Sequence, residues 1–131
     1  MPTCSSLSQA YAVANCPIVN AIDVRVVQLD AWAKAQGIDK IDLIKIDVET
    51  GEPDVLAGME SLLETCSPDI LCEVLHTEHT ASRLEAILTS HRYRFFLVTQ
   101  QGPQPVSHIV PHAQWRNYLF SKRMPSSPES P

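Results

Sequence analysis

The sequence has 131 residues, 44% of them apolar, and its 15 acidic and 10 basic side chains give a formal net charge of −5. This length allows one domain at most, with enough apolar residues for a core. The acidic balance argues against a nucleic-acid-binding protein, and no apolar run is long enough to span a bilayer. The four cysteines form no C-x-x-C pair, so we predict a reduced, cytoplasmic protein.

The two ends of the chain differ in composition from its middle. Residues 1–21 contain no charged side chain and mix Ser, Ala, Cys and Pro, so we expect an irregular N-terminal arm. Residues 122–131 are rich in Pro and Ser, which predicts a disordered tail. The folded unit is therefore expected over residues 22–121.

Strands and helices alternate through that unit. We expect a strand over 22–29, then a short helix over 31–36 that Asp30 caps and Gly37 ends. The remaining elements, in chain order, are a strand over 41–48, a helix over 53–65, a strand over 69–75, a helix over 81–90 with Ser82 and Glu85 at capping-box spacing, a strand over 93–99, a loop over 101–105 and a strand over 117–121. This order predicts an α/β domain with parallel strand pairing.

Three acidic residues lie at the end of the strand over 41–48 and just after it. Asp47 and Glu49 are two residues apart and so share one strand face, and Glu52 follows across a turn that Gly51 permits. Acids this close raise one another's pKa, and they are costly unless a cation, a hydrogen-bond donor or a proton transfer uses them. The structural alternative is that Lys45 pairs with Asp47 while the glutamates are solvated or cap the next helix.

The run Lys-Ile-Asp-Val-Glu-Thr-Gly-Glu-Pro-Asp-Val-Leu-Ala-Gly over 45–58 closely resembles the signature of FkbM-type methyltransferases. The flanks 26–30 and 68–74 resemble it too. The chain differs at Thr50-Gly51, where the family usually has Gly-Ala. The resemblance implies a Rossmann-like class I methyltransferase fold with a mostly parallel sheet, flanking helices and an antiparallel last strand. It also implies S-adenosylmethionine as methyl donor and a small-molecule methyl acceptor.

The resemblance and the residue pattern together suggest site residues. Asp47, Glu49, Glu73 and His76 are candidate catalytic residues, because a methyl transfer to oxygen often needs a base beside the acceptor. Asp47 and Glu52 are candidates for binding the donor. Glu73 interrupts an apolar strand and needs a partner; pairing with Lys45 would make it structural. The corresponding alternative for His76 is a surface histidine.

A glycine-rich turn for the donor is missing from the sequence. Class I methyltransferases carry one after the first strand, but this chain has only four glycines and no G-x-G. We therefore expect the C-terminal half of a methyltransferase domain, which binds the donor weakly or not at all by itself. A second hypothesis is a non-catalytic α/β module that pairs as a homodimer, or with a partner, through an open sheet edge. A third is a metal site on Asp47, Glu49 and Glu52.

Overall fold

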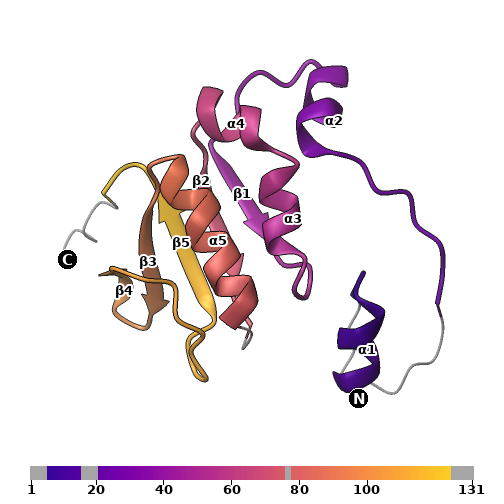
Figure 1. The fold of residues 1–131 in the computed structure, drawn as a ribbon. Coiled ribbons are helices and arrows are strands. Elements are labelled where there is room, and N and C mark those ends of the chain that lie inside the picture. The colour runs from indigo at the N-terminus through magenta and orange to yellow at the C-terminus, as the bar shows by residue number, and fades with distance from the viewer. Residues whose placement is uncertain (1–5, 16–20, 76–77, 125–131) are drawn as a thin grey trace.

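The computed structural model describes residues 6–15, 21–75 and 78–124, and it contains a five-stranded sheet with helices packed on it (Figure 1). The strand order across the sheet is β1-β2-β5-β3-β4. The strands are β1 (Leu43–Ile46), β2 (Asp69–Glu73), β3 (Arg94–Thr99), β4 (Gly102–Val106) and β5 (Asn117–Ser121). The helices are α1 (Gln9–Asn15), α2 (Leu29–Ala35), α3 (Glu52–Ala57), α4 (Glu60–Thr65) and α5 (Glu78–Ser90). The predicted mixed α/β class is confirmed.

The prediction of a mostly parallel sheet is wrong. Only β1 and β2 pair in parallel, whereas the β2–β5, β5–β3 and β3–β4 pairs are antiparallel. The reason is β5, which inserts between β2 and β3 in the opposite direction. The antiparallel last strand implied by the family resemblance is thus confirmed. Since β5 opposes both neighbours, β1, β2 and β3 still run in the same direction.

The segment over 101–105 is a strand, although we expected a loop. Residues 102–106 form β4, which lies at the edge of the sheet and pairs with β3 alone. Pro103 and Pro105 cannot donate to a strand ladder, and an edge strand tolerates them because one of its sides needs no partner. The prolines therefore concealed a strand that tertiary pairing forms.

The helix expected over 53–65 is two helices, α3 and α4, separated at Gly58 and Met59. Asp30 stabilises the start of α4 from another part of the chain. Its carboxylate accepts hydrogen bonds from the backbone N–H groups of Ser61 at 2.9 Å and Leu62 at 3.0 Å. Asp30 is therefore a helix cap, but for α4 and not for α2, which already begins at Leu29.

The capping box expected at Ser82 and Glu85 is also wrong. The helix α5 begins at Glu78, so both residues lie inside it. The hydroxyl of Ser82 donates to the carbonyl of His79. The carboxylate of Glu85 instead contacts His108 and accepts the N–H of Ile109, which ties α5 to the loop before β5.

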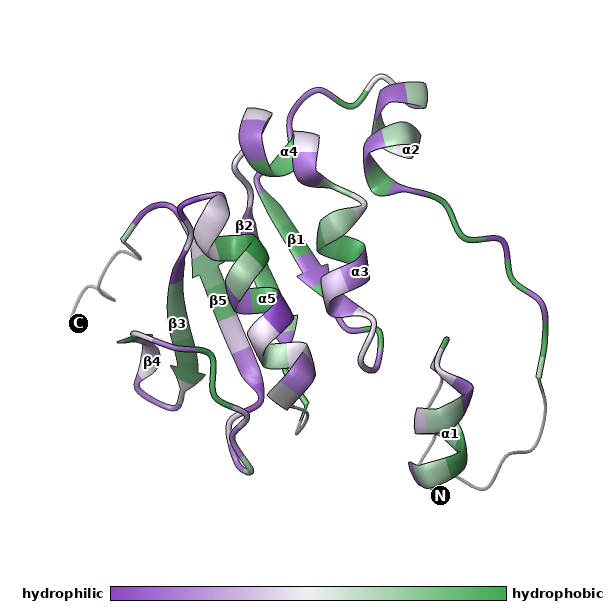
Figure 2. Ribbon diagram, in the orientation of Figure 1, coloured by the Kyte–Doolittle hydropathy of each residue, from purple (hydrophilic) through white to green (hydrophobic). Residues whose placement is uncertain are grey.

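The N-terminal part differs from the prediction in two ways. Residues 9–15 of the arm, expected to be irregular, form the helix α1. Residues 21–28, expected to be a strand, lie in no helix or strand. They form an extended connection beside the body of the molecule, in which apolar and polar residues alternate (Figure 2). Val26 is 70% exposed, and this strand-like segment pairs with no strand among the residues that the structure describes.

The core lies between the sheet and the helices α3, α4 and α5. Its fully buried members include Leu56, Leu63, Ile70, Cys72, Leu84, Leu88 and Phe120. Phe95 and Phe120 contact edge to face with ring centroids 5.9 Å apart. No helix among the described residues is long and apolar enough to cross a membrane. The predicted tail falls mostly on residues 125–131, outside the described part of the chain.

Candidate functional site

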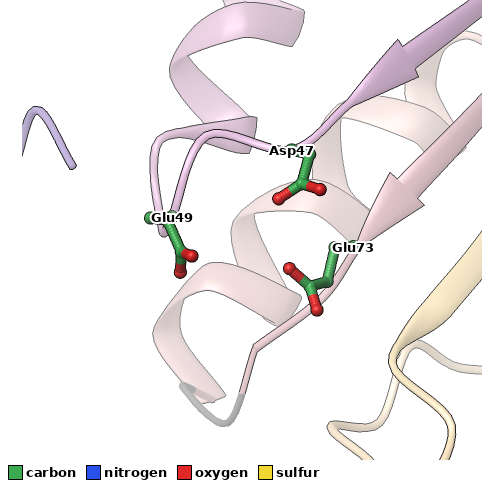
Figure 3. Close-up of side chains that lie close together, drawn as sticks. All are labelled: Asp47, Glu49 and Glu73. Carbon is green, nitrogen blue, oxygen red and sulfur yellow. The ribbon is translucent and has the colours of Figure 1, made fainter. Parts of the chain in front are cut away.

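Three carboxylates meet where β1 and β2 end. The parallel register pairs Ile46 with Cys72, so the next residues, Asp47 and Glu73, emerge side by side from the same edge of the sheet. Glu49 approaches them from the loop that follows β1 (Figure 3). One carboxylate oxygen from each of the three residues lies within 4.8 Å of the others. The acidic cluster, defined as Asp47, Glu49 and Glu73, thus has a different third member from the sequence-based trio that included Glu52.

Within the acidic cluster, Glu73 has a raised pKa. Burial raises the pKa of the Glu73 carboxyl, and the charge of Asp47, a hydrogen bond with Asp47 and the charge of Glu49 raise it further. Arg116 lowers this pKa in part by its positive charge. A carboxylate with a raised pKa holds a proton more readily near neutral pH, which is the property of a general base or acid.

Asp47 has a cation as partner. The Nζ atom of Lys45 lies 3.2 Å from Oδ2 of Asp47, and both side chains are about half exposed. The structural alternative stated for this pair is therefore confirmed. An exposed ion pair of this kind contributes little to stability, so it does not prevent Asp47 from also contacting a ligand.

Glu52 lies beneath the turn and not in the acidic cluster. Its side chain is 1% exposed, and Oε1 accepts the backbone N–H groups of Val48 at 3.3 Å and Thr50 at 3.2 Å. Oε2 is buried and has no hydrogen-bond partner among the described residues. Glu52 therefore shapes the turn that presents Glu49, while contact with the donor stays a prediction.

The turn places positive φ angles on residues that are not glycine. Glu49 has a φ of 52° and Thr50 a φ of 82°, whereas Gly51 has a φ of −90°. Gly51, which we expected to permit the turn, therefore has a conformation that other residues can also adopt. Position 50, where the family usually has Gly, carries the requirement for a left-handed conformation, and a β-branched Thr meets it at a cost in strain.

A cavity of about 550 Å³ opens beside the turn. Its walls come from the arm, from the extended segment and from the start of α3. They are lined by Leu7, Ser8, Val26, Val27, Gln28, Leu29, Val48, Glu49, Thr50, Gly51, Asp54, Val55 and Gly58. Six of these residues are aliphatic and two are carboxylates, of which Asp54 is paired with Arg83 at 2.6 Å, so the lining suits an organic ligand with apolar parts.

Sequence reasoning missed two residues of this region. One is Tyr11 on α1. Burial raises the pKa of its phenol most, and a hydrogen bond with Glu49 and the negative charge of Glu49 raise it further. Arg116 acts on the charges of both Glu73 and Tyr11. Arg116 lies in the run over 115–120 that resembles the closing motif of FkbM-type chains, but no site role was predicted for it or for Tyr11. Only the fold brings residues 11 and 116 near the ends of β1 and β2. His76 lies outside the described residues, and its neighbour His79 is exposed.

In open α/β sheets, ligands generally bind outside the carboxyl ends of the parallel strands, and the acidic cluster lies at that edge, where β1 and β2 end. A model of the FkbM methyltransferase domain matches residues 6–95. The chain therefore belongs to the FkbM methyltransferase family. The match begins in the arm at residue 6, before the flank over 26–30 that resembles the family, so it includes α1. Comparison with curated proteins and with solved structures gives no match.

Proposed function

We propose that this chain carries the catalytic edge of a methyltransferase that uses S-adenosylmethionine and methylates a hydroxyl group of a small molecule. The observation that supports this proposal most directly is the acidic cluster at the edge of a family-matched domain, beside the cavity. The donor supplies a methyl group already activated on a sulfonium. The protein then contributes alignment of the acceptor and a base for its proton.

The cavity beside the turn fits such a donor. Its aliphatic residues suit the apolar parts of the donor, and Glu49 supplies negative charge for a sulfonium cation, whereas the carboxylate of Asp54 is paired with Arg83 at 2.6 Å. Asp47, which has Lys45 as its partner, is proposed to orient the ligands at this edge. Glu73 is proposed to accept the hydroxyl proton of the acceptor, because its raised pKa makes it the stronger base.

Donor binding by this chain alone is proposed to be weak, because the sequence has no G-x-G turn to hold the donor's adenosine and carboxylate groups. An NMR titration with millimolar S-adenosylmethionine tests the site. Shifts confined to the cavity residues would support it, and no shift there would exclude it. Isothermal titration tests the affinity: a micromolar dissociation constant would contradict the expected weakness. A cytoplasmic location also stays a proposal, consistent with free thiols at Cys66 and Cys72.

Glu73 and a control separate catalysis from binding. In a methyl-transfer assay, Glu73→Gln is expected to lower kcat while leaving donor affinity unchanged. Glu60→Gln, which removes an exposed acid at the start of α4, is expected to change neither. Equal activity of wild type and Glu73→Gln would exclude Glu73 as the base.

A second candidate function is supported by a different observation. The outer side of β1 is an open edge of the sheet, and apolar side chains stand exposed on β1 and on the extended segment: Ile22, Val24, Val26, Val27 and Leu43. Open edges and such patches favour pairing with another chain. We propose self-association through this edge, without catalysis, as the alternative.

Light scattering over a range of concentrations tests the alternative. Self-association predicts a dimer mass that Leu43→Lys reduces, whereas Val110→Lys, at an equally exposed valine in the loop before β5, leaves it unchanged. A monomer mass at every concentration would rule this function out.

A further inference from the structure

The outer side of β1 carries backbone groups in strand geometry that have no partner. The carbonyl of Asp42, just before β1, accepts the N–H of Asp69 at 2.9 Å, so the even-numbered residues of this strand bond to β2. Because successive residues of a strand turn their backbone groups to opposite sides, Leu43 and Lys45 point theirs outward. No backbone hydrogen bond joins that side of β1 to another described residue. Such an edge can accept a further strand.

The extended segment over 21–28 has the sequence of a strand and no strand to pair with. Ile22, Val24 and Val26 alternate with the charged residues Asp23 and Arg25, and the three apolar side chains are all more than half exposed. Residues 21–27 make no backbone hydrogen bond with another described residue. The segment therefore offers both a free backbone and apolar side chains to a partner.

The last residues of this segment are held beside α3 of their own chain. The N–H of Asp30 donates to the carbonyl of Gly58 at 3.0 Å, and the backbone of Gln28 lies against Gly58. From this point the rest of the segment runs away from the sheet (Figure 1), so it does not reach β1 of its own chain. The edge of a second copy is not restricted in this way.

A parallel register aligns the charges of the segment with those at the end of β1. When Asp23 stands opposite Lys45, Arg25 stands opposite Asp47. Opposite charges that face each other across a strand pair are stabilising. The antiparallel register through the same Asp23–Lys45 pair puts Arg25 opposite Leu43, so it matches only one pair of charges. The parallel register is therefore favoured.

The same parallel register also aligns the apolar residues. Ile22 and Val24 stand opposite Ile44 and Ile46, whose side chains belong to the core or pack against it. A shift by one residue would turn the charges of the segment toward this apolar face. Polarity and charge thus specify the same register.

We propose that residues 21–28 of one copy add to the open edge of β1 in a second copy as a parallel strand, which brings Arg25 of the first copy beside Asp47 of the second. This inference deepens the self-association proposed above, on which it rests, and it does not depend on methyl transfer. Asp47 belongs to the acidic cluster, so the added guanidinium offsets part of the repulsion among the carboxylates. One short strand buries little surface, so we expect a weak dimer that dissociates on dilution.

Proline substitutions test the strand addition. In the parallel register, the N–H groups of even-numbered residues of the segment point to β1, and those of odd-numbered residues point away. Val24→Pro removes a donor to β1, so light scattering over a range of concentrations should show only monomer. The matched control Val27→Pro loses an N–H that points away and should keep the dimer. A dimer that Val24→Pro leaves intact would overturn strand addition, even if Leu43→Lys shows that the edge self-associates.

Amide exchange followed by NMR reports on β1 itself. The N–H of Lys45 points outward, so its exchange should slow as the protein concentration rises. The N–H of Ile46 already faces β2, and its exchange should not depend on concentration. Exchange at Lys45 that is the same at every concentration would also overturn the proposal.

A charge exchange tests the register. Arg25→Asp is expected to raise the dissociation constant of the dimer about fivefold, and adding Asp47→Arg to it should restore the wild-type value. Lys34→Asp, at an exposed lysine of α2, is the matched control and should change the constant little. Failure of the double variant to recover would overturn the register. A monomer at every concentration would end both this inference and the self-association, while the methyl-transfer assay would still decide the first proposed function.

Discussion

The extended segment over 21–28 and the body of this protein contain similar apolar residues, but only those of the body are buried. In the body, Ile70 and Leu63 are fully buried, whereas Val24 and Val26, in the segment before α2, are 55% and 70% exposed. The segment 21–28 has four β-branched residues, which favour strands, whereas β2 has one, Ile70. Only β2 has a strand on each side. Strand-like sequence therefore becomes a strand only where a neighbour pairs with it.

The largest expected contrast in the free energy of unfolding lies between substitutions of a core leucine and of a valine in the extended segment over 21–28. Leu63→Ala should lower the free energy of unfolding by about 3 kcal/mol, because it leaves a cavity in a fully buried site. Val26→Ala should change it by no more than about 0.5 kcal/mol. Urea denaturation followed by circular dichroism measures both. A comparable loss of stability in the two variants would show that the extended segment is packed in solution. It would contradict the contrast between this segment and the body.

The next largest effect on stability is expected at Asp30, whose carboxylate links α2 to the start of α4. Asp30→Ala removes the cap from α4 and should cost about 1 kcal/mol. Asp30→Asn keeps an acceptor and should cost less. The matched control is Asp39→Ala at an exposed aspartate before β1, with little expected change. Urea midpoints decide the matter: if Asp30→Ala behaves like the control, the carboxylate does not cap α4.

The turn that touches the arm should become more stable by a substitution. Thr50 adopts a φ of 82°, at a strain of about 1–3 kcal/mol, and glycine relieves it while losing about 0.5–1 kcal/mol of chain entropy. Thr50→Gly is therefore expected to stabilise the protein by about 1 kcal/mol. Thr50→Asn, which tolerates this conformation better than Thr, should give a smaller gain. Thermal melts of the three proteins measure the effect, and a loss of stability in Thr50→Gly would mean that the turn differs in solution.

The smallest expected effect is a pH dependence of the melting temperature that arises from Glu73 in the body. Folding raises the pKa of Glu73 above its ordinary 4.5, so its ionisation opposes folding. This penalty is absent below the unfolded pKa and reaches its full value above the folded pKa. Glu73→Gln should therefore melt with the wild type near pH 4 and at a higher temperature than the wild type near pH 7. The same difference at both pH values would contradict a raised pKa.

Much of the body could be predicted because its signals are local. The apolar run before Asp47, the near-continuous apolar run around Ile70 and the aromatic run at Phe95 each predicted a strand that the structure contains. The helical periodicity of Leu56, Leu62 and Leu63 predicted buried faces correctly. The break at Gly58 was missed, because the apolar spacing continues across it while the cap comes from Asp30, 31 residues away from Ser61.

The acidic cluster was predicted in part, because some of its signals are also local in the sequence. The spacing of Asp47 and Glu49, together with the interruption of a strand by Glu73, pointed to one sheet edge. Whether Glu52 or Glu73 completes the cluster depends on the pairing of β1 with β2. The place of the arm could not be predicted at all, because the hydrogen bond from Ser6 to the carbonyl of Glu49 spans 43 residues.

The sequence by itself determined the family, the mixed α/β class and the acids at the end of β1, since these depend on the order and periodicity of neighbouring residues. The tertiary structure decided the antiparallel majority of the sheet, the strand β4 despite its prolines, and the absence of a strand over 21–28. Each of these depends on which backbone edge lies beside which, and hydrogen bonds between distant segments leave no mark on local composition. The membership of the acidic cluster was decided in the same way.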